Sequence, residues 1–365
     1  MTQSAYTFDT VPWSSLTITD RAAWARIRAD RADLKSPFFS LGWHDAVQEA
    51  RSGVEVVRIS QLGKPVGYLP FNRCPFGMLR PVGAPMSDWH GVVGPTDLTL
   101  DQDAILQAAR GKAFRFSGAA AGDPVLGQAQ ASVTTSHVMD LTGGYEAYVQ
   151  EAASAHPKAF RNLRARSRKL ADRRVEVRLD DRAGSSLTKV LEMKRDQYRR
   201  TRQVDIFGFR WTRRLSDLLV ARPASSDPEG ARGLLSTLWI DGDLAAGHLG
   251  LLSSKELHYW FPVYDDRYSE FSPGIALLHE IARGSSELGV SRIDLGDGDY
   301  RFKQEFANRQ VPALGGTART SGRIGRRLSL STSNPDDPSL PDRGIARVSH
   351  ALKRRVDLLS DLHRW

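Results

Sequence analysis

The sequence contains a single cysteine, Cys74, among its 365 residues. One thiol cannot close a disulfide within the chain or build a cysteine-rich metal site, so we expect Cys74 to be a packing residue. Chains without disulfides suit a reducing compartment. The N-terminal "MTQSAYTFDTVPWSS" also lacks the basic and apolar segments of a signal peptide. We therefore expect a cytoplasmic protein.

Long apolar runs are also missing, since no stretch approaches the roughly 18–20 residues that span a bilayer. The phosphate-binding, dinucleotide-binding, zinc-protease and serine-hydrolase motifs are absent as well. Nothing has the spacing of a metal site, so we expect no metal. The 41% hydrophobic and 25% charged content is typical of a globular protein, and the length suits two ordinary domains.

The chain has a net charge of +9, which favours anionic partners such as nucleotides, CoA phosphates, nucleic acid or anionic lipid surfaces. Its densest basic segment is "HPKAFRNLRARSRKLADRR", with one acid. A solvated helix face is one interpretation. The other is a site for an anionic acceptor, such as a sugar diphosphate or polyprenyl diphosphate, bound by Lys158, Arg161 and Arg164. The charge suits tRNA equally, but interleaved aromatic residues are sparse, which disfavours RNA.

The hydrophobic patterns predict two halves with the same order, β–α–α–β–β–β–α–β. In the second half the strands "LLSTLWI", "LAAGHLGLL" and "ELHYWFPV" precede a helix, the strand "SRIDLG" and the short helix "YRFKQEFA". Asp241-Gly242 is typical of a hairpin turn. We predict an α/β fold with mixed sheets (α+β) and two tandem domains, residues 1–141 and 142–310.

From Val311 the composition shifts to Gly, Ser, Pro and Arg, which predicts a loop or linker. The chain ends in "GIARVSHALKRRVDLLSDLHRW", a basic amphipathic pattern. We predict that residues 311–365 form a linker and a C-terminal helix. This helix either packs on its own protein or contacts a partner or the inner face of a membrane.

Ser272-Pro273-Gly274 stand where the apolar strand gives way to a helical pattern. Serine suits an N-cap and proline the first helical position. The unpaired amides of a helix N-terminus bind anions, and Gly274 would let a phosphate approach the backbone. Arg267 could add a charge-assisted contact. The alternative is an ordinary helix start, for which the same residues are suitable.

Several motifs together resemble those of the CelD/BcsL group of GNAT-superfamily acyltransferases, which are linked to bacterial polysaccharide biosynthesis. Tyr264-Asp265 and Tyr268 stand before the Ser-Pro-Gly junction, and "IDLGDGDYRFKQEFA" follows its helix. "FFSLGWHDAV" and "SDWHGVV" also fit the group, although Trp89 stands where many relatives have tyrosine. The resemblance places Tyr264 with the cofactor-binding residues, and Asp88 and Lys303 with the substrate-binding residues.

The resemblance implies two tandem GNAT-like domains, the first of them degenerate, and a more distant similarity to the FemAB aminoacyltransferases. It also implies that the strand before the Ser-Pro-Gly helix diverges from the strand after it. The reaction would be acyl transfer from acetyl-CoA or a longer acyl-CoA to an amine. The acceptor would be an amino sugar or a polysaccharide or cell-envelope precursor, either a small molecule or lipid-linked. Two alternatives stay open: a FemAB-like enzyme with an aminoacyl-tRNA donor, and a non-catalytic partner of a polysaccharide synthesis complex.

Acyl transfer from a thioester needs a base for the amine and a proton for the leaving thiolate. His248, within the strand "LAAGHLGLL", is one candidate base, and its small neighbours would leave room for a ligand. Asp294, Asp297 and Asp299 follow another strand and are further candidates, although the last two also suit a loop that caps a helix. Tyr300 is a candidate proton donor to the thiolate, or else a buried aromatic residue.

Overall fold

The computed structural model describes residues 6–129 and 131–321. These residues form two compact units. The first unit contains residues 6–31, 47–129, 131–132 and 314–321. The second contains residues 32–46 and 133–313.

In the first unit the strand order is β1-β2-β3-β4-β5. Neighbouring strands are antiparallel except β4 and β5, which are parallel. Residues of β2, β3 and β5 build an apolar core with helix α3. The elements are β1 (Tyr6–Pro12), α1 (Ile18–Ala29), β2 (Val54–Gln61), β3 (Lys64–Arg73), β4 (Met78–Arg80), α3 (Gln102–Ala108) and β5 (Ala113–Ala120); α2 (Leu41–Arg51) begins in the second unit and ends in the first.

In the second unit the strand order is β6-β11-β10-β9-β8-β7. Only β10 and β11 are parallel. The elements are β6 (Ala131–Asp140), α4 (Tyr145–Ala155), α5 (Pro157–Leu170), β7 (Val175–Arg178), α6 (Gly184–Arg200), α7 (Arg210–Ala221), β8 (Arg232–Ile240), β9 (Asp243–Ser253), β10 (Glu256–Tyr264), α8 (Pro273–Arg283), β11 (Arg292–Asp297), α9 (Arg301–Phe306) and β12 (Arg309–Arg319); β6 begins in the first unit, and β12 ends in it.

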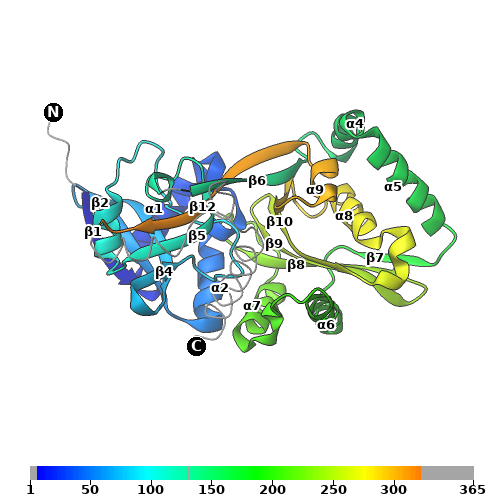
Figure 1. The fold of residues 1–365 in the computed structure, drawn as a ribbon, viewed down its shortest axis with the longest axis horizontal. Coiled ribbons are helices and arrows are strands. Elements are labelled where there is room, and N and C mark those ends of the chain that lie inside the picture. Colours follow the sequence, from blue (N-terminus) through cyan, green and yellow to red (C-terminus); the bar gives the residue numbers. More distant parts are fainter. Residues whose placement is uncertain (1–5, 130, 322–365) are drawn as a thin grey trace, which may run out of the picture. The chain divides into compact units, whose positions relative to one another are not determined.

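Helices cover both faces of the strands of the second unit (Figure 1). Helix α8 lies on one face with α4 and α5, and α6 and α7 lie on the other. The apolar stripe of α8 includes Leu277, Leu278 and Ile281, which pack in one core with Leu234 and Leu238 of β8. Single-turn 3-10 helices occur at η1 (Trp13–Ser15), η2 (Ala32–Leu34), η3 (Pro37–Phe39), η4 (Pro75–Gly77), η5 (Leu126–Gln128) and η6 (Ile206–Gly208), and a longer one at η7 (Asp266–Phe271).

The predicted mixed α/β fold and its order of elements are confirmed. One expectation is wrong. Residues 311–319, predicted as a loop or linker, instead form the end of β12, which continues to Arg319. Pairing overrides the glycine-rich local signal here: the Thr134 hydroxyl donates to the Ala313 carbonyl at 3.4 Å, and the Ser132 hydroxyl to the Gly315 carbonyl at 3.0 Å. The predicted C-terminal helix lies outside the described residues.

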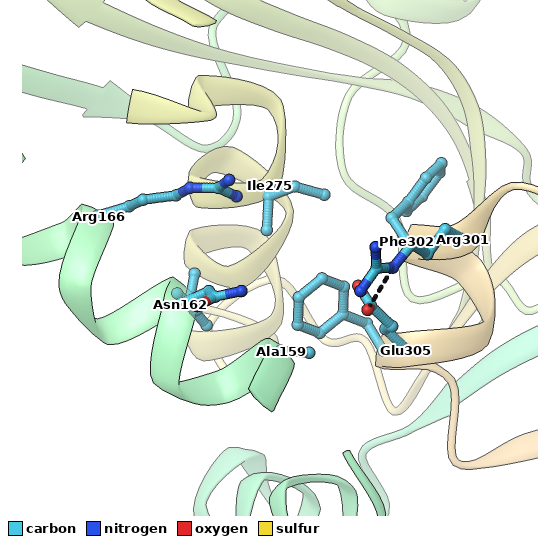
Figure 2. A pocket seen from close by; sticks show the side chains of 9 residues that line it. Ala159, Asn162, Arg166, Ile275, Arg301, Phe302 and Glu305 are labelled. Carbon is cyan, nitrogen blue, oxygen red and sulfur yellow. Dashed lines mark hydrogen bonds and ion pairs between the residues drawn. The ribbon is translucent and has the colours of Figure 1, made fainter. Parts of the chain in front are cut away.

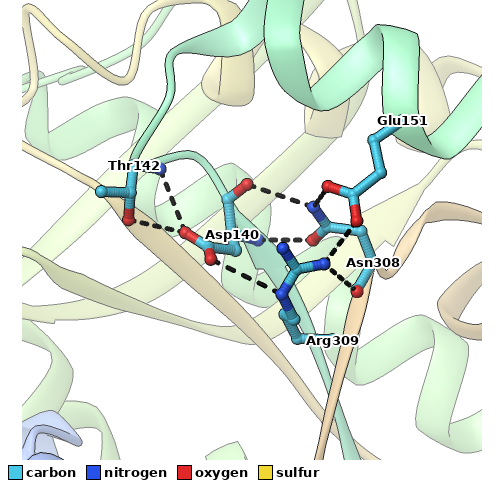
Figure 3. A network of polar contacts seen from close by, with 5 residues as sticks. All are labelled: Asp140, Thr142, Glu151, Asn308 and Arg309. Atoms are coloured by element: carbon cyan, nitrogen blue, oxygen red, sulfur yellow. Dashed lines mark hydrogen bonds and ion pairs between the residues drawn. The ribbon is translucent and has the colours of Figure 1, made fainter.

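A polar network fixes the end of β6 against the start of β12 (Figure 3). The Asp140 N–H donates to Asn308 Oδ1 at 2.8 Å, and Asn308 Nδ2 donates to Glu151 of α4 at 2.7 Å. Arg309 pairs with the same glutamate at 2.5 Å. The Thr142 hydroxyl donates to Asp140 Oδ1 at 2.6 Å. Side-chain hydrogen bonds thus join two strand ends that are distant in sequence.

Candidate functional site

The parallel pairing of β10 and β11 extends over only three residues. It ends with His258 opposite Asp294. On its other side, β10 shifts register against β9 between His258 and Phe261. From Tyr259 onward, the β11-facing edge of β10 therefore has no strand partner among the described residues. This is the divergence of strands that the sequence resemblance implied, and we call it the splay.

A buried polar cluster lies where the splay begins. His258 Nδ1 lies 3.3 Å from Asp294 Oδ2, and both side chains are almost fully buried. The Ser136 hydroxyl of β6 donates to Asp294 Oδ1 at 2.5 Å, and the Gly296 N–H donates to the same oxygen at 2.8 Å. Burial raises the pKa of Asp294, but the His258 charge and these hydrogen bonds outweigh it and lower the pKa to about 2.

Four predicted site residues gather just beyond this cluster. Asp297 and Asp299 are exposed at the end of β11, Tyr300 precedes α9, and Lys303 lies on α9. Lys303 Nζ donates to the Asp297 carbonyl at 2.5 Å and lies 5.6 Å from the centre of the Tyr300 ring. The structure therefore keeps these four residues close together, between the end of β11 and α9.

Gly296 lies between His258 and Lys303. Its φ of +75° favours glycine. A Cβ atom there would lie 3.5 Å from Lys303 Nζ and 3.9 Å from His258 Nε2. The imidazole and the ammonium group thus approach the same point above the Gly296 backbone, and a side chain at residue 296 would fill that point.

His248 lies elsewhere, in the middle of β9. Its ring stacks on Tyr259 at 4.0 Å, and neither ring nitrogen has a hydrogen-bond partner among the described residues. Burial lowers its pKa to about 3. The expected room beside it is filled: a Cβ at Gly250 would lie 2.6 Å from His248 Cε1, and one at Gly247 would lie 2.3 Å from Val190. A base role for His248 stays a prediction, but the geometry favours His258.

Sequence reasoning did not single out His258, because "ELHYWFPV" reads as an apolar strand and its partners are distant in sequence. A signal does exist. Alignment of "ELH" with "RID" as parallel neighbours places His258 opposite Asp294. The sequence indicated Lys194 of α6 only as the start of the basic stretch "KRDQYRR", which would also suit tRNA. Its Nζ donates to the Pro262 carbonyl of β10 at 2.8 Å, and burial lowers its pKa to about 8.

The start of α8 differs in detail from the expectation. Ser272 occupies the N-cap, but its backbone is left-handed with a φ of 48°, and its side chain makes no capping hydrogen bond. Its carbonyl accepts the N–H groups of Ile275 and Ala276. Pro273 takes the first helical position. The Gly274 N–H has no acceptor among the described residues, which leaves one amide for an anion.

Packing does not require glycine at residue 274. A Cβ there would lie 3.5 Å from Tyr264 Cδ1, an ordinary contact, and its φ is not positive. Arg267 is already engaged, because its Nη2 lies 2.7 Å from Asp265 Oδ2, and Asp265 also accepts the Arg267 N–H at 2.9 Å. The structure therefore assigns Asp265 to capping η7. A phosphate contact of Arg267 stays a prediction.

A pocket of about 290 Å³ lies between α5, α8 and α9 (Figure 2). Asn162 and Arg166 line it from α5, and Ile275 lines it from the first turn of α8. On α9, Arg301 pairs with Glu305 at 2.7 Å. The pocket thus combines an apolar wall with two guanidinium groups beside the start of α8.

The remaining cations of α5 face away from the core. The substrate-binding candidates Lys158, Arg161 and Arg164 are exposed. No carboxylate of the described residues pairs with any cation of this helix, whereas exposed arginines nearby are paired, such as Arg173 with Asp241. An uncompensated positive face remains, which suits an anionic ligand.

The last predicted contact, Asp88, lies in the first unit, on the loop between β4 and α3. Its side chain is exposed, and its carbonyl packs against the backbone of β5, since a Cβ at Gly118 would lie 1.7 Å from the Asp88 oxygen. Cys74 is buried, as expected of a packing residue. Among the described residues no group of side chains could hold a metal ion, and no helix is long and apolar enough to cross a membrane.

Comparison with known proteins agrees with this geometry. Residues 157–304 match the acetyltransferase (GNAT) domain family. They contain β10, α8, β11 and the splay, so the protein carries a GNAT-type acyltransferase domain in its second unit. No curated protein matches the sequence.

Among solved structures, FemX is similar to this chain with a TM-score of 0.55 and 12% identity, covering 82% of this chain and 96% of FemX. The C-terminal domain of a putative lysylphosphatidylglycerol synthetase from Agrobacterium fabrum has a TM-score of 0.49 at 13% identity, over 85% of this chain and 96% of that one. A tandem GNAT protein of clavulanic acid biosynthesis has a TM-score of 0.45 at 11% identity, over 87% and 100%. At 12% identity the similarity to FemX shows a shared fold and no more.

Proposed function

We propose that the protein is an acyl-CoA-dependent N-acyltransferase that acts on an amino sugar or on a polysaccharide or cell-envelope precursor. The observation that carries this proposal is the splay of β10 and β11 with a buried His258–Asp294 pair at its base, inside the matched acetyltransferase domain. The free edge of β10 suits the amides of a pantetheine arm, which would add to it as a strand does.

The donor's phosphates would lie at the start of α8, next to the Gly274 N–H and the pocket lined by Arg166. The Gly274 amide and the Arg166 guanidinium suit a phosphate group, whereas Arg301 is paired with Glu305. The residues present therefore fit acyl-CoA. They differ from a glycine-rich phosphate loop, since Gly274 is the single glycine from Tyr264 to Leu278.

His258 would take the proton from the acceptor amine, with Asp294 as the group that orients the ring and stabilises its charged form. His258 is only 1% exposed, so the amine, or one water, must enter the splay beside Gly296. As the amine attacks, a C–N bond forms and the thioester C–S bond breaks. The proton passes to His258, and the leaving thiolate takes a proton from Tyr300 or solvent.

The acceptor would be anionic, because Lys158, Arg161 and Arg164 form an exposed positive face on α5 and Lys303 lies beside Gly296. A lipid-linked sugar diphosphate or a soluble nucleotide sugar satisfies the same chemistry. The polysaccharide assignment and the CelD/BcsL relationship rest on the sequence resemblance. Contact with the inner face of a membrane through the C-terminal residues is part of the same proposal, as is a cytoplasmic location.

Calorimetric titration of the full chain with CoA tests the donor assignment. We expect micromolar binding, with density for the diphosphate at Ser272–Gly274 in a crystal of the complex. No heat with saturating CoA, together with an empty splay in the soaked crystal, would rule out the donor.

A second function shares the fold but changes the donor to an aminoacyl-tRNA. The fold similarity to FemX and the unpaired cations of α5 favour it. Filter binding with charged tRNA separates the two. Binding that survives physiological salt, without CoA binding, supports the alternative; binding only at low salt is non-specific attraction to phosphates.

A further inference from the structure

Residues 32–46 belong to the second unit although they precede most of the first unit in sequence. We call them the insert. The insert contains "FFSLGW", one of the motifs that the acyl-transfer mechanism above leaves unexplained. It begins at η2, passes through η3 and ends in the first turns of α2.

Hydrogen bonds of its backbone hold the insert on the residues before β8. The Gly42 N–H donates to the Glu229 carbonyl at 2.8 Å, and the Leu41 N–H donates to the Glu229 carboxylate at 3.1 Å. The Arg222 guanidinium donates to the Gly42 carbonyl at 2.6 Å. A Cβ on residue 42 would lie 2.3 Å from the Ala231 nitrogen. Glycine is therefore required for this close approach.

Aromatic rings of the insert cover the base of the splay. Phe38 lies edge-on to His258 at 5.0 Å and to Trp260 at 5.8 Å. Trp43 lies 5.6 Å from Trp260 and 5.0 Å from Phe38. The exposed fractions are 2% for Phe38, 0% for Trp43 and 8% for Trp260. Trp260 is in the stretch where β10 changes register, so the rings fill the space next to the point where the reacting carbonyl would lie.

We propose that the insert limits the donor to short acyl groups, acetyl or propionyl. This inference rests on the proposed function, since it needs an acyl-CoA in the splay with its thioester beside residues 259–261. An acyl chain that continues from that carbonyl meets Phe38 and Trp260. Each additional methylene must displace a packed ring, and overpacking of this kind is unfavourable. A pocket discriminates by roughly 10- to 200-fold for one methylene group.

The test is a calorimetric titration of the full chain with CoA, acetyl-CoA, butyryl-CoA and hexanoyl-CoA, none of which requires the acceptor to be known. We expect acetyl-CoA to bind at least tenfold more tightly than hexanoyl-CoA. In Phe38→Ala the difference should shrink to less than threefold, because the missing ring leaves space for the chain. Phe76→Ala, a phenylalanine that is 87% exposed in the first unit, is the matched control and should behave as wild type.

Two further variants keep the proposal testable if Phe38→Ala does not fold. Phe38→Leu should give an intermediate preference, and Gly42→Ala should loosen the insert and weaken the preference without altering CoA affinity. Equal affinity of wild type for acetyl-CoA and hexanoyl-CoA would overturn the proposal. An equal loss of affinity for all four ligands in the variants would also overturn it. Failure of wild type to bind unacylated CoA would instead remove the proposed function itself.

Discussion

The two units share the order β–α–α–β–β–β–α–β and differ where their parallel strand pair ends. In the second unit the pair ends in polar side chains, His258 opposite Asp294. In the first unit β4 and β5 are parallel neighbours for two residues, and the pair ends with Leu79 opposite Phe114. Both of these side chains are fully buried in an apolar core. The same backbone arrangement therefore holds ionisable groups in one unit and hydrocarbon in the other.

The units also differ beyond the end of the parallel pair. In the first unit the loop after β4 pairs with the strands on both sides beyond the end of β4. His90 forms a parallel bridge with Ala119 of β5, and Val93 pairs with Tyr68 of β3. The His90 Nε2 accepts the N–H groups of Ser117 and Gly118. The loop "SDWHGVV" thus uses the backbone groups that the splay of the second unit leaves free. We therefore expect the donor to bind in the second unit, where the edge of β10 stays free, and not in the first.

The largest expected effect tests the polar end of the parallel β10–β11 pair in the second unit. His258→Gln should lower kcat by about 10²- to 10⁴-fold, because glutamine cannot accept the amine proton. CoA affinity should stay within about twofold. Release of CoA thiol in the presence of an amino sugar panel measures the rate. His90→Gln in the first unit is the control, and it should lower stability without lowering kcat.

An equal loss of kcat in both histidine variants would contradict the difference between the units. So would full activity of His258→Gln, which would return the base role to His248 or to the exposed aspartates.

The next effect concerns the start of α8. Gly274→Asp places a carboxylate where the donor's phosphates would lie, and we expect CoA affinity to fall by roughly 10- to 100-fold. The melting temperature should not fall, since an acid near a helix N-terminus is favourable and a Cβ fits beside Tyr264. Gly184→Asp at the start of α6, where a Cβ meets nothing within 4 Å, is the matched control. Equal losses of affinity in both variants would point to net charge rather than to a phosphate site.

Substitution of a glycine of the first unit should lower stability and leave CoA affinity unchanged, the reverse of the effect of Gly274→Asp. Gly118→Ala puts a Cβ 1.7 Å from the Asp88 carbonyl oxygen. Such overpacking typically costs about 1–3 kcal/mol, so urea unfolding should show a clear loss of stability with CoA affinity unchanged. A loss of CoA binding in the folded variant would show that the first unit takes part in donor binding.

The smallest effect is a pH dependence of stability. The pKa of Asp294 is about 2 in the folded protein, below its ordinary value of 3.8. Its contribution to stability is therefore complete above about pH 4 and is lost as the pH falls from about 4 to 2. Urea unfolding from pH 6 to pH 2 should show a steeper loss in wild type than in Asp294→Asn. Parallel curves would mean that Asp294 is not held in its charged form.

The order of elements could be predicted from the sequence because it depends on local patterns. The hairpin at Asp241-Gly242 and the periodicity of α8 are examples. The β12 strand could not be predicted, because its glycine-rich stretch is ordered by partners elsewhere in the chain, such as the Ser132 hydroxyl on the Gly315 carbonyl. Whether a segment finds such partners is not encoded in its own residues.

The candidate site was predictable in part for the same reason. Asp297, Asp299, Tyr300 and Lys303 are neighbours in sequence, and the structure keeps them together. The pair at the base of the splay depends on register between distant strands, and the hydroxyl that orients Asp294 lies 158 residues before it. The role of "FFSLGW" was equally hidden, because only the fold places residues 32–46 in the second unit.

The stoichiometry of CoA binding tests most directly the claim that the second unit alone holds the donor. Calorimetric titration of the full chain should give one CoA per chain. That binding should be weakened roughly 10- to 100-fold in Gly274→Asp and should be unchanged in His90→Gln. A stoichiometry of two, or a single site whose affinity is unchanged in Gly274→Asp and lost in His90→Gln, would contradict the account.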